Sequence, residues 1–268
     1  MNLRDRIVVV TGAGSGIGRS TALAFAREGA RIAACDVDRG RLDALKTELG
    51  DRALLVEKVD VASRSEMAAF AAAVHAKAPA ADVVVNNAGV AVAGTFLETS
   101  LDDWDWLLGV NLRGVIHGCH FFAPKMVERG AGGHIVNISS IFGIIAPPSV
   151  TAYVASKWAV RGLSMSLREE LAPHKIGVTA ICPGMINTQI VADGRTMPSM
   201  SARKSKVVDA FKARGTSPDV VAAAILAAVR TNPAVQPVGT DAKVVAMLNR
   251  LAPRAIAKVG AAVQRRLA

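Results

Sequence analysis

The sequence predicts an α/β fold in which helices cover both faces of a doubly wound parallel sheet of about seven strands. Short segments rich in apolar and β-branched residues alternate with stretches long enough to form helices. Most of these short segments are apolar throughout, which is typical of parallel strands buried on both faces. The expected strands are residues 6–11, 31–36, 53–59, 82–87, 133–139, 177–183 and 234–239.

The chain has 268 residues, of which 51% are hydrophobic, so it can form a sizeable core. No internal repeat or linker divides it. We therefore expect a single domain over residues 1–239 and a basic helical C-terminal extension over residues 240–268. No apolar run approaches the roughly 18 residues of a membrane-spanning helix. The three cysteines, Cys35, Cys119 and Cys182, form no CxxC pair, which favours a reducing cytoplasm.

The first expected strand ends in the sequence TGAGSGIG. Gly12, Gly16 and Gly18 would let the backbone turn tightly and approach a pyrophosphate, and the following helix would present free N–H groups to that anion. The second strand ends in Asp36, at the distance from the glycines where an acid that binds a ribose is expected. A glycine-rich turn without a ligand is the alternative. The glycines and the carboxylate together favour a dinucleotide site.

The third strand precedes a helix predicted over residues 63–77. Ser63 and Glu66 have the spacing of a capping box, which indicates where the helix begins. The apolar residues at helical spacing are Met67, Phe70 and Val74.

The glycine spacing is TGxxxGxG, and with further motifs it resembles the short-chain dehydrogenase/reductase family. Its members are NAD(P)-binding oxidoreductases with a Rossmann-like fold, acting on CH–OH groups. The resemblance covers residues 4 to about 239, and its motifs occur in the family's order and spacing. Some motifs are weak alone, but together they are highly specific. They are TGAGSGIG, Asp60-Val61, NNAG at 86–89, Asn111, Ser140, YVASK at 153–157 and PGMINT at 183–188.

Tyr153, the only tyrosine, stands four residues before Lys157, so the two share one face of a helix. A nearby ammonium favours the phenolate, so we expect Lys157 to lower the pKa of Tyr153. Tyr153 could then donate a proton to a carbonyl oxygen or accept one from an alcohol. The resemblance implies that Lys157 also binds the nicotinamide ribose, that Ser140 orients the substrate oxygen and that Asn111 holds a relay water. The family's Ser-x-x-Gly pattern fits Ser140 rather than its neighbour Ser139.

The expected cofactor is NAD rather than NADP, because Asp36 would accept both ribose hydroxyls and repel a 2′-phosphate. Ser15 stands where NADP-preferring relatives often carry a basic residue, and Arg39 is interpreted as a solvated charge at a helix start. The resemblance places Asp60 and Val61 at the adenine, residues 87–89 beneath the adenosine ribose, and Ile186 and Thr188 at the carboxamide. The predicted cofactor-binding residues are Gly12, Ser15, Gly16, Ile17, Gly18, Asp36, Asp60, Val61, Asn87, Ala88, Gly89, Tyr153, Lys157, Pro183, Gly184, Ile186 and Thr188.

Residues 189–217 are expected to cover the substrate, as this segment does in the family. Met197, Met200 and Phe211 suit an apolar, adaptable pocket. We expect an apolar ketone or secondary alcohol, such as a lipid or sterol; the alternative is that these residues only pack the lid. The opposite wall is expected from Phe142, Ile144, Ile145, Pro147 and Pro148.

The net charge of +10 is concentrated late in the chain. Residues 189–217 carry +4 and residues 240–268 carry +5, which leaves +1 elsewhere. This distribution is not that of a nucleic-acid-binding surface spread over the fold.

The C-terminal extension carries helical apolar stripes on both sides of Pro253. A basic amphipathic tail can make peripheral contact with an anionic membrane, but packing against its own domain or a dimer partner is the favoured interpretation. The resemblance implies a homodimer through residues 101–128 and 151–173. A tetramer through the last strand is the alternative. The stripe residues are Val244, Leu248, Leu251, Ile256, Val259, Val263 and Leu267.

Two other functions stay open: a catalytically silent NAD-binding scaffold and a nucleotide-sugar epimerase. The intact Asn111, Ser140, Tyr153 and Lys157 argue against the scaffold. The glycine spacing and the missing sugar-binding region argue against the epimerase. The His117-x-x-His120 pair lacks a third ligand in sequence, so no metal is expected. No Gly-x-Ser-x-Gly elbow supports a serine hydrolase.

Overall fold

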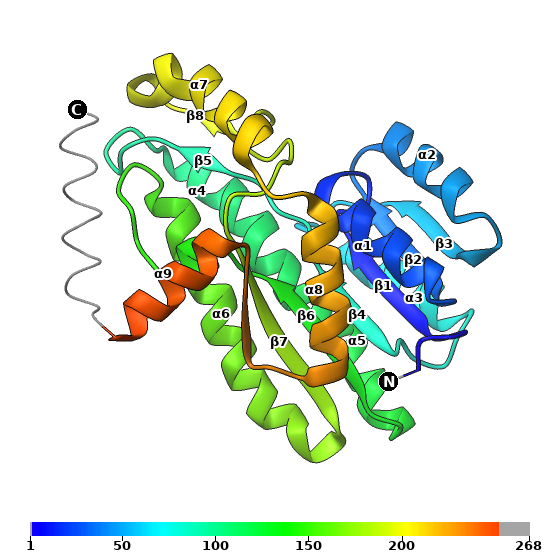
Figure 1. Cartoon of the computed structure of the whole chain (residues 1–268). Coiled ribbons are helices and arrows are strands. Elements are labelled where there is room, and N and C mark those ends of the chain that lie inside the picture. Colours follow the sequence, from blue (N-terminus) through cyan, green and yellow to red (C-terminus); the bar gives the residue numbers. More distant parts are fainter. Residues whose placement is uncertain (1, 252–268) are drawn as a thin grey trace.

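The computed structural model describes residues 2–251. Seven parallel strands form one sheet, with helices on both sides of it (Figure 1). All seven strands expected from the sequence are present, and the predicted fold class is confirmed. The strands of this sheet are β1 (Ile7–Thr11), β2 (Arg31–Asp36), β3 (Ala53–Lys58), β4 (Val83–Asn86), β6 (Gly133–Ile138), β7 (Ile176–Pro183) and β9 (Val235–Val238).

The strand order is β3-β2-β1-β4-β6-β7-β9. The chain builds outward from β1 to β3 and then crosses to β4 on the other side of β1. This reversal is the switch point at which open α/β sheets bind ligands, beyond the carboxyl ends of the strands. The helices are α1 (Gly16–Arg27), α2 (Arg39–Leu49), α3 (Arg64–His75), α4 (Leu101–Leu108), α5 (Gly114–Arg129), α6 (Thr151–Leu171), α7 (Pro198–Arg214), α8 (Pro218–Thr231) and α9 (Thr240–Leu251).

Alternate residues of the strands pack on opposite faces of the sheet. Val9 and Val84 join one core cluster with apolar residues of α3, α5 and α6. Val8, Val10 and Val83 join a second cluster with residues of α1, α2 and α8. Because both faces are covered, the strands need apolar residues at consecutive positions, which explains the continuous runs in the sequence.

The expected cap of α3 forms, but only in part. The Ser63 hydroxyl accepts a hydrogen bond from the backbone N–H of Glu66 at 3.3 Å. The Glu66 carboxylate accepts from the N–H of Asp60 at 2.9 Å. It therefore fastens the preceding loop to α3 instead of completing the reciprocal bond of a capping box.

The structure adds elements that strand and helix periodicity did not indicate. A second, two-stranded sheet pairs β5 (Val92–Ala93) with β8 (Arg195–Thr196). A π-helical turn (Gly109–Arg113) joins α4 to α5 and carries Asn111. Short 3₁₀ turns cover Gly50–Arg52, Ile141–Gly143 and Ala172–His174.

The helix α9 begins directly after the last strand, at the start of the predicted extension. It contains Val244, Leu248 and Leu251 of the expected stripe. The expected second helix, with its stripe from Ile256 to Leu267, and the membrane contact assigned to residues 253–268 lie outside the described residues. Within residues 2–251, no helix is long and apolar enough to cross a membrane.

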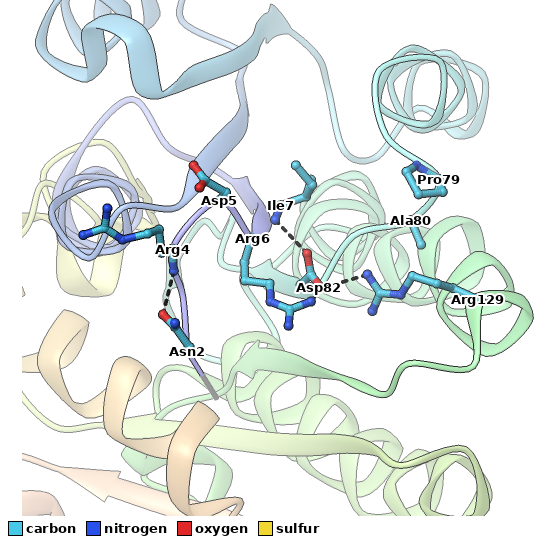
Figure 2. Close-up of a pocket in the computed structure, with 9 residues that line it drawn as sticks. All are labelled: Asn2, Arg4, Asp5, Arg6, Ile7, Pro79, Ala80, Asp82 and Arg129. Carbon is cyan, nitrogen blue, oxygen red and sulfur yellow. Dashed lines mark hydrogen bonds and ion pairs between the residues drawn. The ribbon is translucent and has the colours of Figure 1, made fainter.

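A hollow of about 380 Å³ lies at the amino ends of β1 and β4, opposite the expected ligand site. Figure 2 shows Asp82 there between Arg6 and Arg129. Its carboxylate accepts from Arg6 at 3.0 Å, from Arg129 at 2.8 Å and from the N–H of Ile7 at 2.8 Å. These contacts tie β1, β4 and the end of α5 together, so the hollow is part of the scaffold.

A buried histidine at this end makes stability depend on pH. Burial of His134 on β6, together with the nearby charge of Arg168, lowers the pKa of its imidazole from 6.5 to about 4. Its Nε2 lies 2.9 Å from the Thr179 hydroxyl. As the pH falls through 6.5, the unfolded chain binds a proton that the folded chain resists until about pH 4. Folded-state stability from this residue is therefore complete above pH 6.5 and lost below it.

We expect urea denaturation of the wild type to lose about 2–3 kcal/mol from this residue between pH 7 and pH 4. The His134→Gln variant, which keeps a polar group beside Thr179, should lack this component of the pH dependence. Equal pH slopes for the two proteins would contradict the assignment.

Candidate active site

The carboxyl ends of β1, β4, β6 and β7 lead into four of the motifs singled out in the sequence: TGAGSGIG, NNAG, Ser140 and PGMINT. The loop after β1 contains the glycines, and two of them have backbone angles that favour glycine: φ is +63° at Gly12 and +50° at Gly16. A Cβ on Gly12 would lie 2.7 Å from the Ala88 Cα. A Cβ on Gly18 would overlap the carbonyl oxygen of Gly12. The loop therefore takes this form only with glycine at these positions.

The amino end of α1 fits a pyrophosphate. Ser15 occupies the N-cap position, but its side chain makes no capping hydrogen bond, and the first turn, which includes Ile17, contains no acidic residue. The first N–H groups of this helix are thus left without a side-chain acceptor, and the helix dipole favours an anion there.

Asn87 fastens the glycine loop to the end of β4. Its side-chain amide donates to the carbonyl oxygens of Thr11 at 2.9 Å and Gly12 at 3.0 Å. In return, the Thr11 hydroxyl accepts from the N–H groups of Asn87 and Ala88 at 3.0 and 3.1 Å. The resemblance places residues 87–89 beneath a ribose, and the structure shows that the Asn87 side chain holds the glycine loop. Sequence reasoning missed Thr11, although it begins the glycine motif.

Asp36 ends β2 facing the glycine loop. Its carboxylate accepts from the N–H of Gly14 at 2.9 Å and from the N–H of Asp38 at 3.0 Å. Arg39 forms an exposed ion pair with Asp43 at 3.2 Å, as its interpretation as a solvated charge requires. Asp36 thus keeps a fixed position where it can accept hydrogen bonds from ribose hydroxyls.

Asp60 and Val61 lie in the loop after β3. The Asp60 carboxylate accepts from the N–H of Ala62 at 2.9 Å, and Val61 is buried. The Val61 carbonyl oxygen lies 2.8 Å from Nδ1 of His117, so this histidine has a structural partner. In the part of the chain that the structure describes, no group of three or more His, Cys, Asp or Glu side chains could hold a metal ion.

Asn111 and Lys157 converge beside Gly89. A Cβ on Gly89 would lie 3.4 Å from Asn111 Oδ1 and 3.5 Å from Lys157 Nζ. The side chain of Asn111 bonds the backbone N–H and carbonyl of Val90 at 2.8 and 2.9 Å and donates to the Ser156 hydroxyl at 3.2 Å. The ammonium of Lys157 donates to the carbonyl oxygen of Ile138 at 3.0 Å. Asn111 is therefore held by the segment after β4, and Lys157 by the end of β6.

Tyr153 and Lys157 share one face of α6, as their spacing predicts. Lys157 Nζ lies 5.5 Å from the centre of the Tyr153 ring. The rings of Tyr153 and Phe142 meet edge to face at 6.2 Å. Tyr153 therefore lies between the lysine and the loop that follows Ser140.

The two adjacent serines have different roles. The Ser139 hydroxyl donates to the carbonyl oxygen of Lys157 at 2.8 Å and so fastens β6 to α6. The Ser140 hydroxyl accepts from the N–H of Phe142 at 3.1 Å, and Ser140 acts to lower the pKa of the Tyr153 hydroxyl. This geometry puts Ser140, not Ser139, beside the tyrosine.

The expected direction of the Tyr153 pKa is wrong for this structure. Burial raises the pKa of Tyr153 to about 12, and its hydrogen bond with Ser140 offsets this in part. Burial also lowers the pKa of Lys157 to about 8. Desolvation disfavours the charged form of each group, and it is the largest cause of both shifts. Tyr153 is thus a protonated acid at neutral pH.

The motif after β7 is held by a residue that sequence reasoning missed. Asp241, in the first turn of α9, accepts from the N–H of Met185 at 2.8 Å. A Cβ on Gly184, which follows Pro183, would overlap this carboxylate. An acidic residue in the first turn of a helix is weak evidence for a contact with another segment, since such residues usually stabilise only their own helix.

The other end of this motif approaches the glycine loop. Ile186 is buried and forms an isolated bridge with Thr216, at the end of the expected lid. A Cβ on Gly16 would lie 3.0 Å from the Thr188 side chain. The structure thus brings Thr188 to the amino end of α1.

The expected lid, residues 189–217, forms β8 and α7. Arg195 pairs with Asp103 at 2.8 Å, and its guanidinium lies 4.0 Å from the centre of the Trp106 ring. A Cβ on Gly94 would overlap the Met197 side chain, so Met197 fits closely over that glycine. Met197, Trp106 and Tyr153 all pack against one small apolar cluster. The lid therefore meets the tyrosine across apolar side chains.

The glycine loop at the switch point and the Ser–Tyr–Lys constellation define a dehydrogenase site on a dinucleotide-binding fold. Residues 6–199 match the family model described as short chain dehydrogenase. The chain belongs to this family of oxidoreductases.

Particular relatives agree with this. The chain is 42% identical over 260 residues to EphD of Mycobacterium tuberculosis, named as a probable oxidoreductase, over 94% of this chain and 44% of EphD. It thus spans less than half the length of that relative. It is 36% identical to SadH of the same organism, also named as an oxidoreductase, over 93% of this chain and 92% of SadH. A short-chain dehydrogenase/reductase from Burkholderia phymatum, solved in complex with NAD, matches with a TM-score of 0.87 at 28% identity, over 93% of this chain and 94% of that one.

Proposed function

We propose that this protein is an NAD-dependent oxidoreductase that transfers a hydride between the nicotinamide and an apolar secondary alcohol or ketone. The observation that carries the proposal is the convergence of Ser140, Tyr153, Lys157 and Asn111 at the carboxyl ends of β4 and β6, next to an open helix amino end. The structural neighbour from Burkholderia phymatum was solved with NAD, which supports the choice of cofactor.

The residues divide the reaction between them. NADH supplies the hydride for reduction, and NAD accepts it in oxidation. During reduction the Ser140 hydroxyl donates a hydrogen bond to the carbonyl oxygen and orients it beside Tyr153. Tyr153 transfers its phenolic proton to that oxygen as negative charge develops on it. The ammonium of Lys157 stabilises the phenolate that results, and a water held by Asn111 would return a proton from solvent.

An apolar substrate is supported by the walls around Tyr153. Phe142 meets the Tyr153 ring edge to face, and Met197 and Trp106 pack against the same apolar cluster as Tyr153. The thioether of a methionine adapts to varied apolar shapes. The side chains that would bind the substrate away from its reacting oxygen are therefore mostly apolar.

A screen of ketones and secondary alcohols of increasing apolar size, with NADH or NAD, tests the proposal through the absorbance of reduced nicotinamide. We expect turnover that improves with apolar size. An epimerase would instead convert a nucleotide sugar without net NADH production, and a scaffold would bind NADH without turning over any substrate.

The preference for NAD gives a separate prediction. NADH should bind at least about tenfold more tightly than NADPH, because a 2′-phosphate would lie close to the Asp36 carboxylate. Fluorescence titration of both reduced cofactors measures this. Asp36→Asn should narrow the difference between the two affinities. Asp38→Asn, which alters the cap of α2 and the ion pair of Asp38 with Arg41, should preserve it. Tighter binding of NADPH by the wild type would refute the role of Asp36.

We also propose a homodimer through α5 and α6. An apolar groove of about 530 Å³ runs between these helices. It is lined mainly by aliphatic side chains, which a second copy would cover. Light scattering of the purified protein gives the mass directly. The apolar lining includes Ile116, Ala123, Val127, Leu163, Leu167 and Leu171.

A further inference from the structure

The lid helix α7 is exposed or only partly covered along its whole length. None of its 17 residues is buried, although each of the other described helices from α1 to α9 buries at least one. Figure 1 shows α7 at one extremity of the molecule, beside β8 and β5. Its partly covered side chains include Met200 and Phe211, whereas its basic side chains are mostly exposed.

These basic residues form a stripe. Arg203, Lys206 and Arg214 follow Ser199 at intervals of four, seven and fifteen residues, so all four lie on one side of the helix. The three cationic side chains belong to exposed residues. No ion pair with a carboxylate satisfies any of them within residues 2–251.

Large apolar side chains protrude at the amino end of the stripe. Phe96 is 62% exposed, Leu97 is 93% exposed and Leu101 is 82% exposed. The neighbouring Glu98 accepts from the backbone N–H of Ser199 at 3.0 Å and also from its hydroxyl. This contact brings the segment that carries Phe96 and Leu97 to the amino end of the cationic stripe. We call these exposed apolar residues and the stripe together the apolar–basic face.

We propose that the apolar–basic face docks on an anionic lipid surface. Protruding apolar side chains enter the interface of a bilayer without needing a preformed pocket, and adjacent cations are attracted to anionic head groups. The charge of the lid segment, +4 over residues 189–217, is complementary to such a surface. The inference rests on this surface and not on the proposed reaction, so each can fail without the other.

Sedimentation of the full chain with phosphatidylcholine vesicles, with and without phosphatidylglycerol, tests the proposal. The wild type should bind the anionic vesicles at low salt and be released at high salt, since salt screens the attraction. Replacing Arg203, Lys206 and Arg214 together by Gln should weaken binding by at least about tenfold. The double variant Phe96→Ser, Leu97→Ser should also weaken vesicle binding. It should weaken any binding that remains at high salt as well, because its effect is not electrostatic.

A matched control removes the same charge elsewhere. Arg27, Lys46 and Lys77 are exposed residues on α1, on α2 and just after α3, and replacing them together by Gln should leave binding nearly unchanged. Thermal melting verifies that each variant folds. The proposal is overturned if the wild type stays in the supernatant, if the control weakens binding as much as the stripe variant, or if neither surface variant changes binding.

Discussion

Replacement of Tyr153 by Phe is expected to lower kcat by at least about 10²-fold, the usual cost of losing a general acid. The change removes only the hydroxyl group, so the edge-to-face contact with Phe142 at 6.2 Å is kept. Because burial raises the pKa of Tyr153 to about 12, the phenolic proton is present at neutral pH, and the variant lacks it. Initial rates of ketone reduction, with the substrate found in the screen, measure the loss.

NADH binding and the melting temperature of this variant should stay close to wild type. The two serines supply a matched comparison. Ser140→Ala should lower kcat strongly, whereas Ser139→Ala, which loses the bond to the Lys157 carbonyl, should mainly lower stability. Near-normal turnover by folded Tyr153→Phe protein would remove Tyr153 from the reaction and leave the fold assignment intact.

Replacement of Gly18 by Ala is expected to abolish NADH binding and to destabilise the protein by about 2 kcal/mol or more. The new Cβ would overlap the carbonyl oxygen of Gly12 and lie 2.8 Å from its carbonyl carbon. Both are backbone atoms of the loop that Asn87 holds in place, so the loop itself must move. The amino end of α1 then loses its approach to the pyrophosphate. Calorimetric titration with NADH and urea denaturation measure the two effects.

Gly162→Ala is the matched control. Gly162 lies within α6, and a Cβ there would meet nothing within 4 Å. Because alanine favours a helix over glycine, this variant should be about 0.5–1 kcal/mol more stable and bind NADH normally. If both variants behave alike, the effect at Gly18 does not come from the close approach to Gly12.

The sheet could be predicted because its information is local. Runs such as Val8–Val10 and Val83–Val85 are apolar at consecutive positions. A strand buries every side chain of such a run only if both faces of its sheet are covered. The glycine loop, Asp36 and the Tyr153–Lys157 pair could also be placed, since each lies at the end of such a strand or on one helix face.

Contacts between distant segments could not be predicted. Asp241 reaches Met185 across 56 positions of sequence, and Arg195 reaches Asp103 across 92. Nothing in the local pattern shows which segment each side chain will meet. The direction of the Tyr153 pKa could not be predicted for a related reason. Helical spacing reveals the nearby lysine, but the desolvation that raises this pKa depends on the packing of the whole site.

The hydrogen bond from Met185 to Asp241 connects the motif after β7 (residues 183–188) to the first turn of α9. Gly184 leaves space for that carboxylate and for nothing larger. If the order of residues 183–188 affects how tightly NAD(H) binds, then binding and the order of α9 are thermodynamically linked, and the linkage must be equal in both directions. A cofactor that orders residues 183–188 would then stabilise α9 against local unfolding. In the same way, a partner that binds α9 would slow the dissociation of the cofactor.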